Sequence, residues 1–146
     1  METEAIHFGD QLVIYNQPSE MMKVERWLEE LSDKNRLSAR TRFALDLVLN
    51  EALINVINHG YDDNLEHQIS ININDFPDEL TVEIVDDGRP FNPLQKETPE
   101  LPTSLEEASI GGRGIILLKN YCTEMNYCYS EGKNRLIMTI RKESLQ

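Results

Sequence analysis

Two segments in the first half of the chain have the apolar periodicity of helices. In the first, apolar residues recur every three or four positions, at Met21, Val24, Leu28 and Leu31. That spacing places them on one helical face, and Ser19 precedes them as a candidate N-cap. A polar stretch at 32–37 then predicts a loop. The second helix is predicted from its candidate N-cap Ser38 to His59, with Gly60 placed to end it. Because it is apolar on nearly all sides, we expect burial on most of them.

Five other segments have the patterns of β-strands: 11–15, 69–74, 80–84, 125–129 and 136–140. In the second and third of these, apolar and polar residues alternate, so one face of each strand should be buried. A short turn at 76–79 separates them, which predicts antiparallel pairing. The last two segments are joined by a turn at 131–134 and are expected to form a C-terminal hairpin.

The chain between these groups of strands contains a long stretch without periodicity. Four of the six prolines fall between Pro90 and Pro102, and no pattern returns until Ile110. Such a long loop is often a lid over a ligand, although a solvated excursion has the same sequence appearance. The segment 111–114 then predicts a glycine-rich turn entering a helix. Backbone amides at such a turn can bind an anion, and a plain turn is the alternative.

Composition is that of one ordinary domain. The chain has 146 residues, of which 40% are hydrophobic and 27% are charged. No segment approaches the roughly 20 apolar residues that span a bilayer, and the N-terminus is acidic where a signal peptide is basic. We therefore expect a cytoplasmic protein with no membrane partner. Cys122 and Cys128 are too few for a disulfide scaffold, so both are expected to be free thiols.

The net charge of −12 limits the classes of partner. It arises from 14 basic and 26 acidic residues. Such an excess disfavours binding to a phosphate backbone, so nucleic acid is not an expected partner. A nucleotide is not excluded, because backbone amides, a helix N-terminus and Mg²⁺ can hold a triphosphate without a basic surface.

A polar column interrupts the apolar second helix. Glu51, Asn55 and His59 stand four residues apart, a spacing that aligns side chains along one helical face. An exposed face would more commonly carry Lys with Glu. Carboxylate and amide oxygens instead suit a hard cation such as Mg²⁺, so the column indicates a cation site.

Three motifs follow one another along the chain: this column, Asp86-x-Gly88 at a strand end, and Gly112-x-Gly114 at a helix start. In this order they resemble the N-box and the two glycine boxes of the GHKL ATPase superfamily. Within the superfamily the chain is similar to the bacterial anti-sigma factor serine kinases, and the N-box likeness includes its His-Gly-Tyr ending. Three segments carry the resemblance: 50–61, 87–93 and 110–115.

The resemblance implies a fold and its cofactors. The fold is α+β, a two-layer α/β sandwich of the Bergerat type, in which helices cover one face of a mostly antiparallel sheet. A single histidine-kinase-like ATP-binding domain would occupy residues 1–146, with a lid at about 92–110, and would form a homodimer. The implied cofactors are ATP and Mg²⁺.

Site roles also follow from the resemblance. Asn55 matches the N-box residue that coordinates Mg²⁺, and Glu51 matches the general base. A buried polar pair bonded to backbone is the structural alternative for these two. Asp86 matches the residue that accepts a hydrogen bond from the adenine amine, and Gly88 lets the purine approach the backbone. His59 is interpreted as a helix-end residue.

The remaining positions leave alternatives open. Gly112 and Gly114 match the glycines that bind phosphates, whereas Arg113 between them either reaches the triphosphate or is solvated. Asp87 makes the register of the glycine-box Asp ambiguous, since it is either that residue or a turn residue. The sequence also departs from the family pattern in its last strand. It has Asn134-Arg135 where many relatives have a Gly-Thr pair that helps to bind the base.

Three functions are compatible with these motifs. By resemblance, the chain is an ATP- and Mg²⁺-dependent anti-sigma factor that binds a sigma factor and phosphorylates a serine or threonine of a STAS-domain antagonist. A second hypothesis is the ATP-binding half of a sensor histidine kinase acting in trans, although His7 lies outside any helical hairpin that could present it. A third is a non-catalytic ATP-binding module, which would not require the base Glu51.

Overall fold

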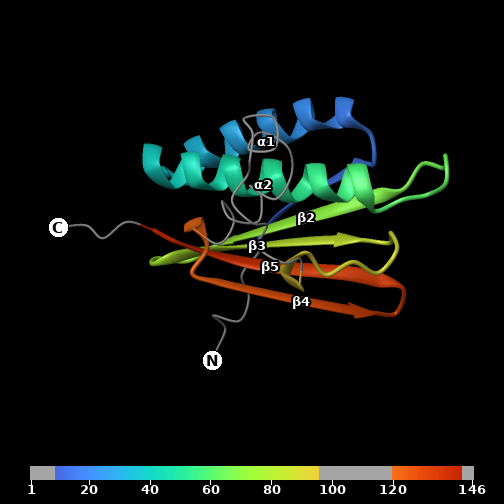
Figure 1. Ribbon diagram of the computed structural model, residues 1–146. Helices are drawn as coiled ribbons and strands as arrows, with labels where there is room; N and C mark the ends of the chain where they lie inside the picture. The colour runs from blue at the N-terminus through green and yellow to red at the C-terminus, as the bar shows by residue number, and fades with distance from the viewer. Residues whose placement is uncertain (1–8, 96–119, 143–146) are drawn as a thin grey trace, which may run out of the picture.

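The alternating segments of the sequence form a five-stranded sheet, and two helices lie against one of its faces (Figure 1). The computed structural model describes residues 9–95 and 120–142. The strand order is β1-β2-β3-β5-β4, and every neighbouring pair is antiparallel. The structure thus confirms the predicted α+β sandwich.

The elements follow the predicted order. The strands are β1 Asp10–Tyr15, β2 Gln68–Asp75, β3 Glu79–Asp86, β4 Glu124–Ser130 and β5 Lys133–Arg141. The helices are α1 Met21–Lys34 and α2 Ala39–His59, with short 3₁₀ turns at Pro18–Glu20 (η2) and Pro93–Gln95 (η3). No helix in the described ranges is long and apolar enough to cross a membrane. Cys122 and Cys128 are free thiols, as predicted.

The hydrophobic core lies between the helices and the sheet. Fully buried side chains from α2 meet those of the central strands: Leu45, Leu49, Leu53, Ile69, Ile71, Leu80, Ile84, Met138 and Ile140. Each contributes about 1.5–3 kcal/mol by leaving water. Burial of α2 on most sides was a wrong expectation. Its buried residues form one stripe, while Phe43 is 58% and Ile54 is 38% exposed, because among the described elements the sheet and α1 contact only part of its circumference.

The helix ends correct two local predictions. Ser38 caps α2 as predicted, because its hydroxyl accepts a hydrogen bond from Thr41 N at 3.1 Å. Ser19 does not cap α1, since it lies inside η2 and the helix begins after Glu20. The predicted loop at 32–37 is also too long at its start: α1 continues to Lys34, and Ser32 is buried within it.

The end of α2 and the last hairpin depend on glycines in different ways. Gly60 ends α2 as predicted, but with φ of −83°, so left-handed backbone is not the reason for glycine there. A Cβ at Gly60 would instead lie 2.7 Å from the Val56 carbonyl oxygen. In the hairpin, Glu131 and Gly132 have φ of 55° and 76° and form a two-residue turn. The predicted turn at 131–134 was therefore too long, and Asn134 belongs to β5.

The two serines offer a matched test of this capping. Ser38→Ala should lower the free energy of unfolding by about 1 kcal/mol, because one amide of the first turn of α2 loses its partner. Ser19→Ala should change it by less than about 0.5 kcal/mol, as expected for an exposed residue that caps nothing. Urea unfolding of both variants measures the difference. Equal losses would contradict the assignment of the cap.

Candidate functional site

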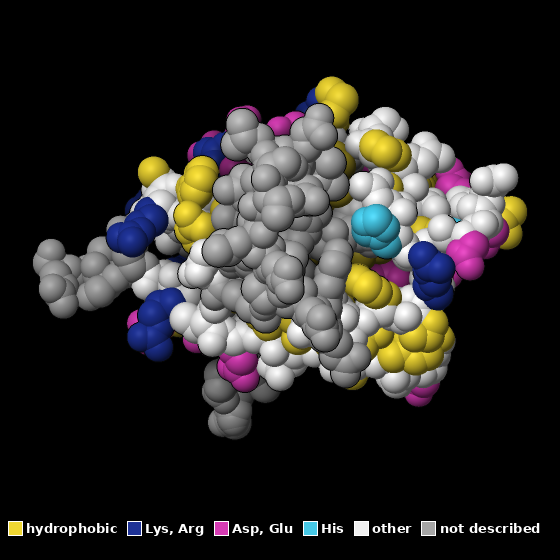
Figure 2. Space-filling model, in the orientation of Figure 1, with side chains coloured by type: hydrophobic (Ala, Val, Ile, Leu, Met, Phe, Trp, Pro, Cys, Tyr) yellow, Lys and Arg dark blue, Asp and Glu magenta, His cyan; other side chains and the backbone are white. Residues whose placement is uncertain are grey.

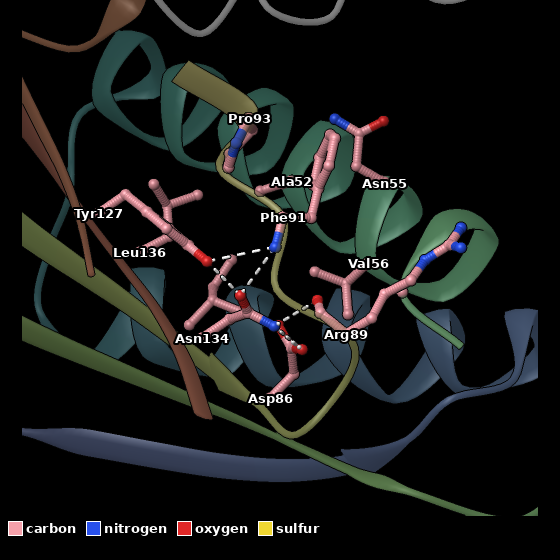
Figure 3. A pocket seen from close by; sticks show the side chains of 12 residues that line it. Ala52, Asn55, Val56, Asp86, Arg89, Phe91, Pro93, Tyr127, Asn134 and Leu136 are labelled. Atoms are coloured by element: carbon pink, nitrogen blue, oxygen red, sulfur yellow. Dashed lines mark hydrogen bonds between the residues drawn. The ribbon is translucent and has the colours of Figure 1, made fainter. Parts of the chain in front are cut away.

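The second half of α2 faces the last residues of β3 and the first residues of β5, and a cavity lies at this place (Figure 3). Its walls come from α2, from the strands and from the loop that follows β3. The lining residues are Ala52, Asn55, Val56, Gly60, Ile84, Asp86, Arg89, Phe91, Pro93, Tyr127, Asn134 and Leu136. The lining is mainly apolar with a few polar groups that converge, which is the usual composition of a small-molecule site.

Asp86 is the buried charge of this cavity. It occupies the last position of β3, continuing the core-facing row of Leu80, Val82 and Ile84, and is 6% exposed. Its Oδ1 accepts hydrogen bonds from Gly88 N at 2.8 Å and from Asn134 Nδ2 at 3.0 Å. No other donor to Asp86 occurs among the described residues. Burial raises the pKa of Asp86, although these two hydrogen bonds favour its ionised form.

The structure distinguishes the two neighbouring carboxylates. Asp86 lines the cavity, whereas the Asp87 side chain is 46% exposed and bonds to His67 outside it. The alternation of β3 accounts for this, since successive side chains point to opposite faces. Asp86 is therefore the carboxylate available to a ligand in the cavity.

Gly88 brings the loop after β3 against the end of α2. A Cβ at this position would lie 2.5 Å from the Gly60 carbonyl oxygen and 3.0 Å from Asp86 Oδ1. Two further bonds hold the contact: Arg89 N donates to Gly60 O at 2.9 Å, and Arg89 Nε donates to His59 O at 3.0 Å. The His59 backbone thus acts at the helix end, while its side chain is exposed.

Asn55 and Glu51 lie on successive turns of α2, as the sequence predicts. Asn55 is half-buried and lines the cavity, and no described residue bonds to its side chain. Glu51 is also half-buried, one turn earlier, but is not among the lining residues. The arrangement brings Asn55 and Asp86, which are 31 positions apart, to one cavity and leaves Glu51 beyond its edge.

Residues 14–140 match the family of histidine kinase-like ATPase domains. The chain belongs to this family. Among its relatives, the serine/threonine-protein kinase BtrW of Bordetella bronchiseptica is 33% identical over 113 residues, which cover 77% of this chain and 80% of BtrW. The serine-protein kinase RsbW of Bacillus subtilis is 29% identical over 85 residues, 56% of this chain and 53% of RsbW.

Two further proteins are similar to this ATPase domain. The anti-sigma F factor of Shouchella clausii is 31% identical over 78 residues, which cover 53% of each protein. Among solved structures, the blue-light activated histidine kinase of Erythrobacter litoralis EL346 superposes with a TM-score of 0.51 at 21% identity. The superposed region covers 71% of this chain and 31% of the histidine kinase chain. At that identity the likeness concerns the fold alone.

Asn134 and Tyr127 both line this cavity. From the sequence, Asn134 was noted only as a departure from the Gly-Thr pair of many relatives, and Tyr127 was not singled out. Asn134 was placed in a turn, but the structure puts it in β5, 6% exposed and bonded to Asp86. Tyr127 of β4 lines the same cavity and donates its hydroxyl to Asn134 Oδ1. The sequence feature that could have placed Asn134 in the strand is the alternation of β5, in which Asn134 continues the core-facing row of Leu136, Met138 and Ile140.

His67 holds two acidic residues beside the cavity. Its Nε2 bonds to Asp63 Oδ1 at 2.8 Å, and its Nδ1 bonds to Asp87 Oδ1 at 3.1 Å. Since carboxylates only accept hydrogen bonds, both ring nitrogens must be protonated to make both. The bonds to Asp63 and then Asp87 raise the pKa of His67. Tyr61 stacks on the imidazole, with ring centroids 4.5 Å apart. In Figure 2, acidic, basic and histidine side chains lie on the surface at the right of the view, where α2 ends in Figure 1.

The second glycine box lies outside the described residues. This applies to Gly112, Arg113 and Gly114 and to the predicted lid beyond Gln95. Of the helix predicted after residue 114, the structure describes Asn120 and Tyr121, which are helical.

The described groups fit a magnesium nucleotide. The cavity itself has a volume of about 30 Å³, close to that of one water molecule, so a purine must displace part of its rim. Phe91 is one of the lining residues, and its side chain is 39% exposed. No cluster of three metal-ligating side chains occurs among the described residues. Mg²⁺ commonly takes one or two protein ligands together with phosphates and water, and the unbonded Asn55 amide suits that role.

The His67 contacts predict a pH-dependent stability. A raised folded-state pKa means that the stabilisation is complete below the usual pKa of about 6.5 and is lost as pH rises through the folded-state value. His67→Gln should therefore be most destabilising, relative to the wild type, at about pH 5 and least at about pH 9. Asp63→Asn should lose less stability at low pH than His67→Gln does, because His67 keeps its bond to Asp87. Urea unfolding across this range measures it, and parallel pH profiles for the wild type and His67→Gln would refute it.

Proposed function

We propose that this chain is an ATP- and Mg²⁺-dependent anti-sigma factor that phosphorylates a serine or threonine of a STAS-domain antagonist. The proposal rests on the cavity shared by Asn55 of the N-box and Asp86 of the first glycine box. Its relatives support the reaction class, since BtrW is a serine/threonine-protein kinase and another relative is an anti-sigma F factor.

Asp86 and Asn55 would hold the two ends of the nucleotide. Asp86 Oδ2, which has no donor among the described residues, would accept a hydrogen bond from the exocyclic amine of adenine. The Asn55 amide oxygen would hold Mg²⁺. Gly112, Arg113 and Gly114 are proposed to supply the phosphate contacts. Bound Mg·ATP supplies the phosphoryl group and the charge that neutralises the leaving phosphate.

Glu51 is proposed as the general base. Its position beyond the cavity edge, one helical turn from Asn55, suits a group that acts on an incoming hydroxyl rather than on the base of the nucleotide. The Glu51 carboxylate would accept the proton of the substrate serine or threonine as that oxygen attacks. The protein scaffold therefore contributes positioning and one proton acceptor.

The partners follow from the same proposal. The chain would bind a sigma factor and a STAS-domain antagonist, act as a homodimer in the cytoplasm, and fold as one domain over residues 1–146 with a lid at about 92–110. Its net charge of −12 supports protein partners over nucleic acid.

The direct test mixes the protein with γ-labelled ATP, Mg²⁺ and a candidate STAS-domain antagonist. We expect label on serine or threonine, and none when Mg²⁺ is chelated. Label on histidine would instead indicate a histidine kinase acting in trans. ATP binding without transfer would indicate a non-catalytic module.

Replacing the proposed base separates binding from transfer. Glu51→Gln should lower the rate of transfer roughly 10²–10⁴-fold, the usual contribution of a positioned base, while leaving ATP binding unchanged. Glu30→Gln, at an exposed position of α1, is the matched control and should transfer at the wild-type rate. An unchanged rate for Glu51→Gln would exclude it as the base.

Replacing the buried carboxylate should separate stability from binding. Asp86→Asn can keep both hydrogen bonds to Oδ1 while removing a charge whose pKa is raised by burial. A raised folded-state pKa disfavours folding above the usual pKa, so at about pH 7 the variant should be at least as stable as the wild type. It should lose ATP binding, because an amide nitrogen would face the adenine amine. Calorimetry of unfolding and of binding measures both, and full ATP binding would contradict the role of Asp86.

A further inference from the structure

Asn134 places a carboxamide where the sheet otherwise buries apolar side chains. It pairs directly with Asp86 in the register of β3 and β5, and it is 6% exposed. The next core-facing positions of the two strands are Ile84 and Leu136, which are both buried. A buried amide disfavours folding unless its hydrogen bonds are made, so the contacts of Asn134 define its role.

The carboxamide uses both of its ends (Figure 3). Its Nδ2 donates to Asp86 Oδ1 at 3.0 Å and lies 3.0 Å from Arg89 O and 3.2 Å from Gly88 O. Its Oδ1 accepts from Phe91 N at 3.1 Å and from the Tyr127 hydroxyl. One side chain thus holds the Asp86 carboxylate and the backbone of the loop that follows β3.

This network fixes the orientation of both side chains. The Asn134 amide cannot be reversed, because its oxygen would then face the Asp86 carboxylate and two carbonyl oxygens. With Oδ1 of Asp86 bonded to Gly88 N and Asn134 Nδ2, Oδ2 is left as the acceptor for a ligand. The direction in which Asp86 presents that oxygen is therefore set by Asn134 together with the Gly88 amide.

We propose that Asn134 is a positioning residue that aims Asp86 at the 6-amino group of a purine and so sets the preference for adenine nucleotides. This inference rests on the proposed ATP site. Asn134 acts through Asp86, and Tyr127 supports it from the other side of the amide. Loss of Asn134 leaves the Gly88 amide as the single donor to Oδ1 among the described residues, and the carboxylate can turn about that one bond. The protein then keeps a nucleotide pocket that no longer distinguishes the amine.

The test compares ATP with purine riboside triphosphate, which has hydrogen in place of the 6-amino group. Dissociation constants for both are measured by calorimetry with Mg²⁺ for the wild type, Asn134→Ala and Asn126→Ala. Asn126 is an exposed asparagine on β4 that bonds to Glu124, and it serves as the matched control. The wild type and the control should prefer ATP roughly tenfold or more, as expected for a hydrogen bond to a charged group. Asn134→Ala should bind both nucleotides about equally.

A purely structural role predicts a different result. It would weaken both nucleotides by the same factor and leave their ratio unchanged, and that outcome overturns the proposal. If Asn134→Ala fails to fold, Tyr127→Phe takes its place: it removes one donor to Asn134 Oδ1 and should lower the preference for ATP to an intermediate value. An unchanged ratio in that variant likewise overturns the proposal.

The outcome is separable from the kinase assay. A wild type that binds both nucleotides equally overturns the role of Asn134 and leaves phosphoryl transfer to be decided by labelling. A wild type that binds neither nucleotide overturns both proposals. If the wild type prefers ATP but transfers no phosphate, the inference about Asn134 stands and the proposed kinase function is overturned.

Discussion

The site depends on the close contact between Gly88 and the end of α2. Gly88 has no Cβ, and this lets the loop after β3 approach the end of α2. A Cβ at this position would lie 2.5 Å from the Gly60 carbonyl oxygen. Two bonds from Arg89 to the backbone of residues 59 and 60 hold the loop there. Because α2 and β3 both end at this contact, Asn55 and Asp86 face the same cavity although they belong to different layers.

The polar groups buried around this contact are not those expected of a region that only stabilises the fold. Asp86 and Asn134 are polar in rows that continue as Ile84 and Leu136, and the Tyr61 hydroxyl is buried with no hydrogen-bond partner among the described residues. Burial, followed by the charge of Asp86, raises the pKa of that phenol. Such groups oppose folding unless they are paired, and their concentration at one point is typical of a ligand site rather than of a core.

How far the sequence predicts the structure depends on the range of the interaction. Periodicity predicts the strands and helices because an element with one buried face must repeat its apolar residues at the period of that element. The motifs predict Asn55 on a helix and Asp86 at a strand end, where the structure has them. Ser19 failed as a cap because the 3₁₀ turn that begins at Pro18 continues into α1, so no described side chain caps the start of that helix. The contacts of Asn134 were not predicted, because all of its partners except Tyr127 lie 43 to 48 positions earlier in the chain. The two-residue turn that moves Asn134 into β5 depends on backbone dihedrals.

The charges near Asp86 also bear on how a nucleotide would lie. Asp87 follows Asp86 directly, Asp63 shares His67 with Asp87, and Asp62 lies 4.0 Å from Nη1 of Arg89, which lines the cavity. A triphosphate is disfavoured beside so many carboxylates, whereas an amine that donates hydrogen bonds is favoured. When protonated, His67 limits the repulsion between Asp63 and Asp87, and it is not among the residues that line the cavity. The acidic end therefore suits the base of the nucleotide, and the unbonded amide of Asn55 on α2 suits its metal and phosphates.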